Sequence, residues 1–321
     1  MNLFEAVVDL VKKRDLFGDW PAMLQIFERA ANREPQGWDI VFLACLSVGG
    51  TIEQAVPAVA ALGCHQITLI IIDDLLDEDP HGVHNEIGTA RGANLASAFQ
   101  AAGMKVVMEG GYPDAVTLAV VERLAHMVVR TALGQELDVQ IPDNEEDYWH
   151  VVRSKSSPYC ETALYTGAML GGASFEVGER LRQLGEIYGE LLQIHDDLKD
   201  TLADPASPDW IQGRITLPIL FAEIVDHPDK ARFLELRGNI EDPDALREAK
   251  TILVRCGAIS YCLDQLISRC QIAKSHLSSI DLVDPAWLET LIEDMVEPAR
   301  QMIQALGCAD GEEEFQALQV K

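Results

Sequence analysis

Two short acidic segments in this sequence share the pattern Asp-Asp-x-x-Asp. They are Asp73-Asp74-Leu75-Leu76-Asp77 and Asp196-Asp197-Leu198-Lys199-Asp200. At this aspartate content, chance predicts about 0.2 such matches in a chain of this length, so a pair of them is informative. Aspartate oxygens are ligands that hard cations such as Mg²⁺ prefer, and Mg²⁺ keeps coordination positions for water and phosphate oxygens. The two segments therefore predict a Mg²⁺ site that binds a phosphate-bearing substrate.

The spacing within each segment places two carboxylates on one side of a helix. Residues four apart lie about 40° apart around the axis, and this applies to Asp73 with Asp77 and to Asp196 with Asp200. Two carboxylates about 6 Å apart repel by about 3 kcal/mol at an effective dielectric constant of about 20. Prolines that follow each segment predict that both lie near helix C-termini, where the helix dipole is already negative. This arrangement favours bound cations over a merely solvated acidic surface, and its spacing excludes an EF-hand.

The rest of the chain has to position these segments, and its apolar spacing is helical almost throughout. One run places Leu181, Leu184, Ile187, Leu191 and Ile194 at three- and four-residue steps, which is the pattern of an amphipathic helix. Alternating strand patterns bounded by hairpin turn signals are absent. We predict one all-α domain over residues 1–321, with about ten to twelve helices and a solvated tail at 306–321.

The net charge and the cysteine content limit the cellular compartments and the classes of partner that the protein is expected to have. The chain has 52 acidic and 25 basic residues, a net charge of -27, which repels nucleic acid and anionic lipid surfaces. The seven cysteines include no C-x-x-C pair, which is typical of a reducing compartment. No signal peptide is expected, and the longest uncharged run of apolar residues, at 55–64 and interrupted by Pro57, is far shorter than the about 20 residues that a membrane span needs. We predict a cytoplasmic protein with no nucleic-acid partner and no integral membrane segment.

Four further segments lie between and after the acidic motifs in a characteristic order. They are Gly134-Gln135-x-x-Asp138, Tyr148 followed by Lys155-Ser156, Gln193-Ile194-His195-Asp196-Asp197, and Gly213-Arg214-Ile215-Thr216-Leu217-Pro218. Together with the acidic motifs, they make residues 35–225 resemble the trans-isoprenyl diphosphate synthase, or polyprenyl synthetase, family of class I isoprenoid synthases. No single segment is specific for that family, but the set is.

The resemblance implies a fold, a metal content and a set of site residues. The fold is the all-α isoprenoid synthase fold, in which the two acidic helices face each other across a deep apolar cavity. Three Mg²⁺ ions, an isoprenyl diphosphate substrate and a homodimer are implied as well. The implied metal ligands are Asp73, Asp74, Asp77, Asp196, Asp197 and Asp200, of which Asp73, Asp77 and Asp196 are the catalytic candidates. The implied diphosphate-binding residues are Gln135, Lys155, Gln193 and Arg214.

Several positions depart from the family pattern, and they concern mainly the second substrate, isopentenyl diphosphate. Where the family has Gly-Gly-Lys-x-x-Arg-Pro, residues 33–38 read Arg-Glu-Pro-Gln-Gly-Trp. Gly82 and Val83 stand in place of two family arginines, and Gln66 stands in place of a family histidine. The family's Gly-Lys pair after the second motif is also missing. The basic residues that could fill the vacant places are Arg33, His65 and Arg91.

These observations predict a Mg²⁺-dependent enzyme that ionises an allylic isoprenyl diphosphate. The small Thr68, about one turn below Asp73 on the same helix, favours a deep pocket and a C15 or longer substrate. The weakened acceptor site favours cyclisation or elimination of the cation, as in a class I terpene synthase, or transfer to a non-standard acceptor. The main alternative is an ordinary trans-prenyltransferase that condenses isopentenyl diphosphate with the allylic diphosphate. A non-catalytic partner subunit is the second alternative, and the retention of both acidic motifs disfavours it.

Overall fold

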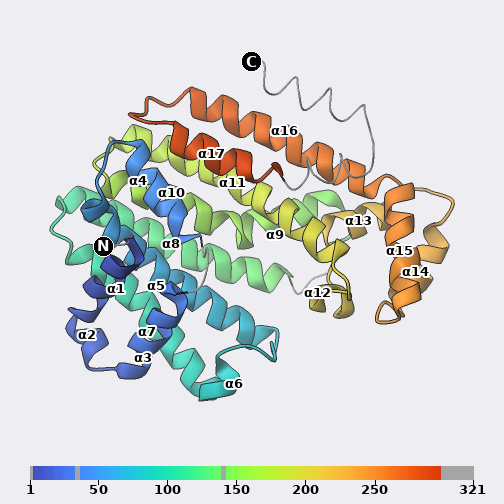
Figure 1. Ribbon diagram of the computed structural model, residues 1–321, viewed down its shortest axis with the longest axis horizontal. Coiled ribbons are helices and arrows are strands. Elements are labelled where there is room, and N and C mark those ends of the chain that lie inside the picture. The colour runs from blue at the N-terminus through green and yellow to red at the C-terminus, as the bar shows by residue number, and fades with distance from the viewer. Residues whose placement is uncertain (1–2, 33–36, 139–141, 298–321) are drawn as a thin grey trace.

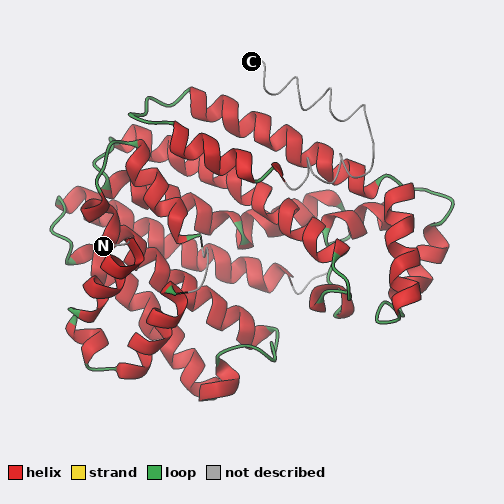
Figure 2. Cartoon of the chain, viewed as in Figure 1, coloured by secondary structure: helices red, strands yellow, loops and turns green. Residues whose placement is uncertain are grey.

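All regular elements in residues 3–32, 37–138 and 142–297, the part of the chain that the computed structural model describes, are helices (Figure 2). They are α1 (Leu3–Lys12), α2 (Asp15–Gly18), α3 (Pro21–Ala31), α4 (Trp38–Ser47), α5 (Ile52–Leu76), α6 (His84–Ile87), α7 (Thr89–Met108), α8 (Asp114–Asp138), α9 (Glu145–Lys155), α10 (Ser157–Leu170), α11 (Phe175–Leu202), α12 (Pro208–Ile211), α13 (Leu217–Ile224), α14 (Lys230–Arg237), α15 (Pro243–Arg255), α16 (Ala258–Ser278) and α17 (Ala286–Asp294). The predicted all-α class is confirmed.

The sequence predicted about ten to twelve helices, whereas these residues form seventeen. Three of them, α2, α6 and α12, are single turns of four residues, and α13 and α14 have only eight. Segments of this length show too little of an apolar period to be recognised in a sequence. The predicted tail at 306–321 lies outside the described residues.

Helix α5 carries the first acidic motif at its C-terminal end. A capping box starts the helix: the Gln54 N–H donates to the Thr51 hydroxyl, and the Gln54 side chain accepts from the Thr51 N–H, which satisfies two N–H groups that a helix start leaves free. The helix ends at Leu76, and Glu78 then adopts a left-handed conformation with φ of 51°. Among the described helices, only α5 is long and apolar enough to cross a membrane, but 72% of that apolar stretch is buried inside the fold. This burial identifies α5 as a core helix of the protein.

Helix α11 carries the second acidic motif, also at its C-terminal end, and packs closely along α10 (Figure 1). Two glycines of α11 allow this approach. A β-carbon on Gly185 would lie 2.5 Å from the carbonyl oxygen of Cys160, and one on Gly189 would lie 2.5 Å from the Cα of Ser157. Packed side chains do not tolerate such distances, so the two glycines determine how close α11 comes to α10.

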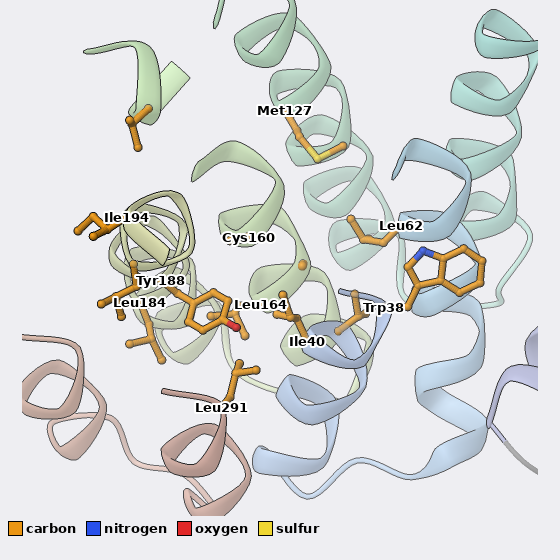
Figure 3. Packing of buried hydrophobic residues seen from close by; sticks show 14 of the residues in the cluster. Trp38, Ile40, Leu62, Met127, Cys160, Leu164, Leu184, Tyr188, Ile194 and Leu291 are labelled. Atoms are coloured by element: carbon orange, nitrogen blue, oxygen red, sulfur yellow. The ribbon is translucent and has the colours of Figure 1, made fainter. Parts of the chain in front are cut away.

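One apolar core lies beneath both motifs. Figure 3 shows Leu62 of α5, Leu164 of α10 and Leu184 of α11 among its buried side chains. Helices α1 and α3 pack on α5, and α12–α15 lie at the opposite side of the molecule (Figure 1). Burial of apolar surface, worth about 25 cal/mol per Å², therefore holds the two motif-bearing helices in one rigid frame.

His65 lies on α5 inside this core. It is fully buried, and its Nδ1 lies 2.9 Å from the carbonyl oxygen of Ala61. A β-carbon on Gly103 of α7 would overlap the imidazole ring, so the ring occupies the space that this glycine leaves. Burial lowers the pKa of His65 to about 4, because desolvation disfavours the imidazolium form. The expectation that His65 could supply a cation to the acceptor side is therefore wrong.

This buried histidine predicts a loss of stability in mild acid. An unfolded-state histidine has a pKa of about 6.5, so between pH 6.5 and 4 the unfolded chain binds a proton that folded His65 does not bind. The free energy of unfolding therefore falls as the pH falls through this window, by about 2 kcal/mol from this group between pH 7.5 and pH 5. Urea unfolding of the wild type and of His65→Gln at these two pH values measures the effect. The variant should lose about 2 kcal/mol less than the wild type, and an equal loss in both proteins would rule the account out.

Candidate active site

The C-terminal parts of α5, α8, α9 and α11, together with residues 209–216, surround a cavity of about 550 Å³. This size is ordinary for a small-ligand site, since such pockets measure about 300–1,000 Å³. The predicted site residues that line it are Asp77, Gln135, Lys155, Gln193, Asp197 and Arg214. Helices that are distant in the sequence thus present polar side chains to one space.

The first acidic motif is held at this cavity by side chains from three other segments. The Gln135 amide donates a hydrogen bond to Asp73 Oδ1, and Arg214 forms an ion pair with Asp77. Lys155 Nζ lies 3.5 Å from the same Asp73 oxygen. Three predicted diphosphate-binding residues are therefore gathered around the two aspartates that share one side of α5.

A carboxylate outside both motifs joins the two cations. Oδ2 of Asp138, at the end of α8, lies 2.6 Å from Lys155 Nζ and 3.4 Å from Arg214 Nη1. Asp209 lies 3.6 Å from Arg214 Nε. Burial lowers the pKa of Lys155, but attraction to Asp138 and Asp73 outweighs it and the net shift is upward. The lysine therefore stays protonated at neutral pH.

Asp209 connects the two motifs electrostatically. Burial raises the pKa of Asp209, and the positive charges of Arg214 and Lys155 partly offset this rise. Burial also raises the pKa of Asp200 in the second motif, and the neighbouring charges of Asp209 and Asp196 raise it further. The Asp196 side chain is 53% exposed. Asp209 thus interacts electrostatically with one carboxylate of each motif, Asp77 and Asp200.

Asp197 is turned into the protein. It is 4% exposed; the Tyr148 hydroxyl and the Leu217 N–H donate to its Oδ2 at 2.7 and 2.6 Å, and Gln193 Nε2 donates to its Oδ1 at 2.8 Å. Burial raises the pKa of Asp197 to about 7, against the effect of these three donors. Three protein donors thus take up most of the acceptor capacity of Asp197, and its role as a metal ligand stays a prediction.

Asp74 lies on a different side of α5 from Asp73 and Asp77. It lines a separate cavity of about 90 Å³, whose other walls include Ile70 and Val83. Burial raises the pKa of Asp74, and nearby carboxylates raise it further. Consecutive helix residues point about 100° apart, which carries this side chain away from the larger cavity. Asp74 therefore lines a different cavity from Asp77, and its role as a metal ligand stays a prediction.

Asp138 and Asp209 were not predicted as site residues. A signal for Asp138 is present, because it lies three positions after Gln135 and residues at this spacing share a helix face. No comparable spacing rule applies to Asp209. The turn between α12 and α13 places it, with the Arg214 N–H donating to the Asp209 carbonyl oxygen at 2.9 Å.

The carboxylates of this site suit Mg²⁺ ions that take most of their ligands from water and from the substrate. Within the described ranges, no three His, Cys, Asp or Glu side chains converge in a ready-made cage. Mg²⁺ in phosphate-binding sites typically takes only one or two carboxylates, and phosphate oxygens complete its shell. The carboxylates that would hold such ions are Asp73 on α5, Asp77 at the C-cap of α5, and Asp196 and Asp200 on α11.

The positions that depart from the family pattern carry no cation where the structure describes them. Gln66 accepts a hydrogen bond from Trp38 Nε1 at 2.5 Å. Val83 lines the smaller cavity beside Asp74, and Arg91 is exposed on α7. Arg33, with the three residues that follow it, lies outside the described residues.

Comparison with known sequences gives consistent results. A family model for polyprenyl synthetase matches residues 39–253. The chain is 26% identical over 276 residues to a short chain isoprenyl diphosphate synthase of Methanothermobacter thermautotrophicus, covering 80% of this chain and 83% of that relative. It is 29% identical over 231 residues to a nonaprenyl diphosphate synthase of Mycobacterium tuberculosis, covering 66% and 68% of the two chains.

Solved structures with the same fold include a geranylgeranyl pyrophosphate synthetase from Pyrococcus horikoshii. Its TM-score is 0.78 at 23% identity, over 92% of this chain and 94% of that one. A geranylgeranyl pyrophosphate synthase from Corynebacterium glutamicum, solved with calcium and isoprenyl diphosphate, has a TM-score of 0.76 at 22% identity, over 92% and 93% of the two chains. These likenesses confirm the predicted isoprenoid synthase fold.

The contact between α8 and α9 provides a test of how the site is positioned. A β-carbon on Gly134 would lie about 2.5 Å from the Lys155 Cα, so Gly134→Ala should displace the end of α9 and move Lys155. We expect the variant to bind inorganic pyrophosphate in the presence of Mg²⁺ about tenfold more weakly, because a charge-assisted contact is weakened. Isothermal titration calorimetry measures this. Gly18→Ala, where an added β-carbon would meet nothing within 4 Å, is the matched control, and equal affinity in the two variants would refute the positioning role.

Proposed function

The chain belongs to the polyprenyl synthetase family, and on that premise we propose that it is a Mg²⁺-dependent enzyme that ionises an allylic isoprenyl diphosphate. The cluster of Lys155, Arg214 and Gln135 around Asp73 and Asp77 carries this proposal. The names of its relatives, which are isoprenyl diphosphate synthases of several chain lengths, support a transferase that acts on isoprenyl diphosphates.

The charge balance of the cavity explains why metal ions are needed. The carboxylates Asp73, Asp77, Asp138, Asp196, Asp200 and Asp209 outnumber the cations Lys155 and Arg214 with which they share the site. This excess of negative charge would repel a diphosphate. Divalent cations are the largest local charges in such sites and reverse this repulsion. Three Mg²⁺ ions, as the resemblance implies, would more than offset the excess.

The residues of the chain have distinct parts in this proposal. When bound, Mg²⁺ supplies Lewis-acid stabilisation of the charge that develops on the leaving diphosphate. Lys155 and Arg214 lie on the cavity wall, where they can donate charge-assisted hydrogen bonds to diphosphate oxygens. Gln135 keeps Asp73 oriented by its hydrogen bond. Apolar side chains below the motifs would shield a hydrocarbon chain and an allylic cation from water.

We further propose that isopentenyl diphosphate is a poor acceptor for this enzyme. Gln66 and Val83 stand where the family has cationic or histidine groups, and His65 is buried and neutral. The cation would then react by cyclisation or elimination, or with a non-standard acceptor. Ordinary chain elongation is the alternative that the relatives' names favour. A non-catalytic partner subunit is disfavoured, because the aspartates and cations of the ionisation site are all present.

The length of the substrate and the assembly state are part of the same proposal. We propose a C15 or longer chain because Thr68, about one turn below Asp73 on α5, is a small residue. A homodimer is supported by the exposed Leu118 and Val129 of α8, which share one face because eleven residues complete three helical turns. Six free cysteines in the described chain support a cytoplasmic location. Light scattering of the purified chain tests the dimer.

The metal requirement is tested by removing one carboxylate from each motif. Asp73→Asn and Asp196→Asn should each lower the rate of pyrophosphate release from an allylic diphosphate by about 100-fold or more, because transition-state charge loses its metal stabilisation. Both variants should stay folded, since each substitution relieves like-charge repulsion. Asp264→Asn, at an exposed position of α16, serves as the control. Unchanged release in either motif variant, or in excess chelator, would disprove the metal site.

The acceptor proposal is tested by product analysis. Charge-assisted hydrogen bonds are worth about 1.5–3 kcal/mol each, so the loss of several should leave isopentenyl diphosphate bound only weakly. With Mg²⁺ and farnesyl or geranylgeranyl diphosphate alone, we expect release of pyrophosphate together with a hydrocarbon or terpene alcohol, identified by mass spectrometry. Added isopentenyl diphosphate should change neither rate nor product. Efficient, saturable elongation at micromolar isopentenyl diphosphate would contradict this proposal and show that the protein is an ordinary chain-elongating synthase.

A further inference from the structure

The three aspartates of the second motif differ in their surroundings. The Asp196 side chain is 53% exposed and Asp200 is half-buried, whereas Asp197 is 4% exposed. Asp197 belongs to the buried stripe of α11 that also includes Ile194 and Thr201. Residues at three- and four-residue steps share one helix face, so this carboxylate points between helices while its two neighbours in the motif face outward.

The partners of Asp197 come from three elements. Tyr148 belongs to α9, Gln193 to α11 itself, and Leu217 provides the first N–H of α13. The start of a helix leaves its N–H groups without intrahelical partners, and no side-chain hydrogen bond caps α13 at Thr216. The Asp197 carboxylate therefore performs the capping of α13 from a neighbouring helix.

Two of these partners are linked to segments that carry a cation of the site. Leu217 lies three residues after Arg214, and the Ser156 hydroxyl, next to Lys155, donates to Gln193 Oε1 at 2.5 Å. A connected set of hydrogen bonds thus runs from the segment of Lys155, through Gln193 and Asp197, to the segment of Arg214. Such a connected set fixes side-chain positions when every member is satisfied.

We propose that Asp197 is a positioning residue, which holds the segments carrying Lys155 and Arg214 in register at the diphosphate site instead of binding metal. This rests on the proposed function, because what it positions is the diphosphate site. The chemistry of the partners requires a carboxylate. All three are donors, so an asparagine amide at this place would direct its own N–H groups either at Gln193 Nε2 or at the Tyr148 hydroxyl and the Leu217 N–H.

The test compares metal affinity with pyrophosphate affinity in full-length variants. Isothermal titration calorimetry gives the affinity for inorganic pyrophosphate at saturating Mg²⁺ and the Mg²⁺ concentration that half-saturates this binding. Asp197→Asn should weaken pyrophosphate binding about tenfold and leave the Mg²⁺ half-saturation within about twofold of the wild type. Asp196→Asn should raise the Mg²⁺ half-saturation by about tenfold or more. Glu176→Gln, exposed at the other end of α11, is the charge-matched control.

Tyr148→Phe keeps the ring and removes only the hydroxyl, so it provides a second variant with little risk to folding. It should weaken pyrophosphate binding about threefold, and the double variant with Asp197→Asn should bind no more weakly than Asp197→Asn alone, because Tyr148 acts through Asp197. Fold-changes that multiply in the double variant, or an Asp197→Asn variant whose Mg²⁺ half-saturation rises as in Asp196→Asn, would overturn the positioning role. A wild type without any Mg²⁺-dependent pyrophosphate binding would instead overturn the proposed function.

Discussion

Lys155 and Arg214 meet at one oxygen of Asp138, and the rest of the site is arranged around that shared contact. Each cation also reaches an aspartate of the first motif, so the two cations hold α5, α8, α9 and the segment before α13 together at one point. Ion pairs that are partly withdrawn from water repay their desolvation only with good geometry and additional hydrogen bonds. Here Gln135 on Asp73 supplies one of those hydrogen bonds. The site is therefore stable with its cations engaged by protein carboxylates, and a diphosphate has to compete with them.

The helical frame makes this arrangement possible. Both acidic motifs lie at the C-terminal ends of long helices of 25 and 28 residues, whose remaining turns are anchored in the core. Glycines at the close crossings, Gly134 between α8 and α9 and Gly189 between α10 and α11, set the distances between those helices. The frame places like charges at helix ends where the dipole adds to their repulsion. Bound cations would offset this electrostatic repulsion.

The sequence identified the chemistry of the site better than the orientation of its side chains. The helical class and the predicted role of Lys155, Arg214 and Gln135 near Asp73 and Asp77 follow from spacing and from the family resemblance. The six-residue ligand set stays a prediction, and the motif alone did not reveal that Asp197 is buried and that Asp74 lines a separate cavity. The apolar spacing of Ile194, Leu198 and Thr201 does place Asp197 in the buried stripe of α11. Asp209 could not be predicted in this way, because it lies in α12, a helix of four residues that shows no apolar period.

The central claim is that this acidic cavity accepts a diphosphate only together with divalent cations. Calorimetric titration of the wild-type protein with inorganic pyrophosphate, once in excess chelator and once in millimolar Mg²⁺, tests it most directly. The account predicts no measurable binding in chelator and an affinity about 100-fold or more tighter with Mg²⁺, because the carboxylates of the site outweigh Lys155 and Arg214 until metal ions are present. Equal pyrophosphate affinity in the two conditions would show that Lys155 and Arg214 bind the anion without metal, and would contradict the account.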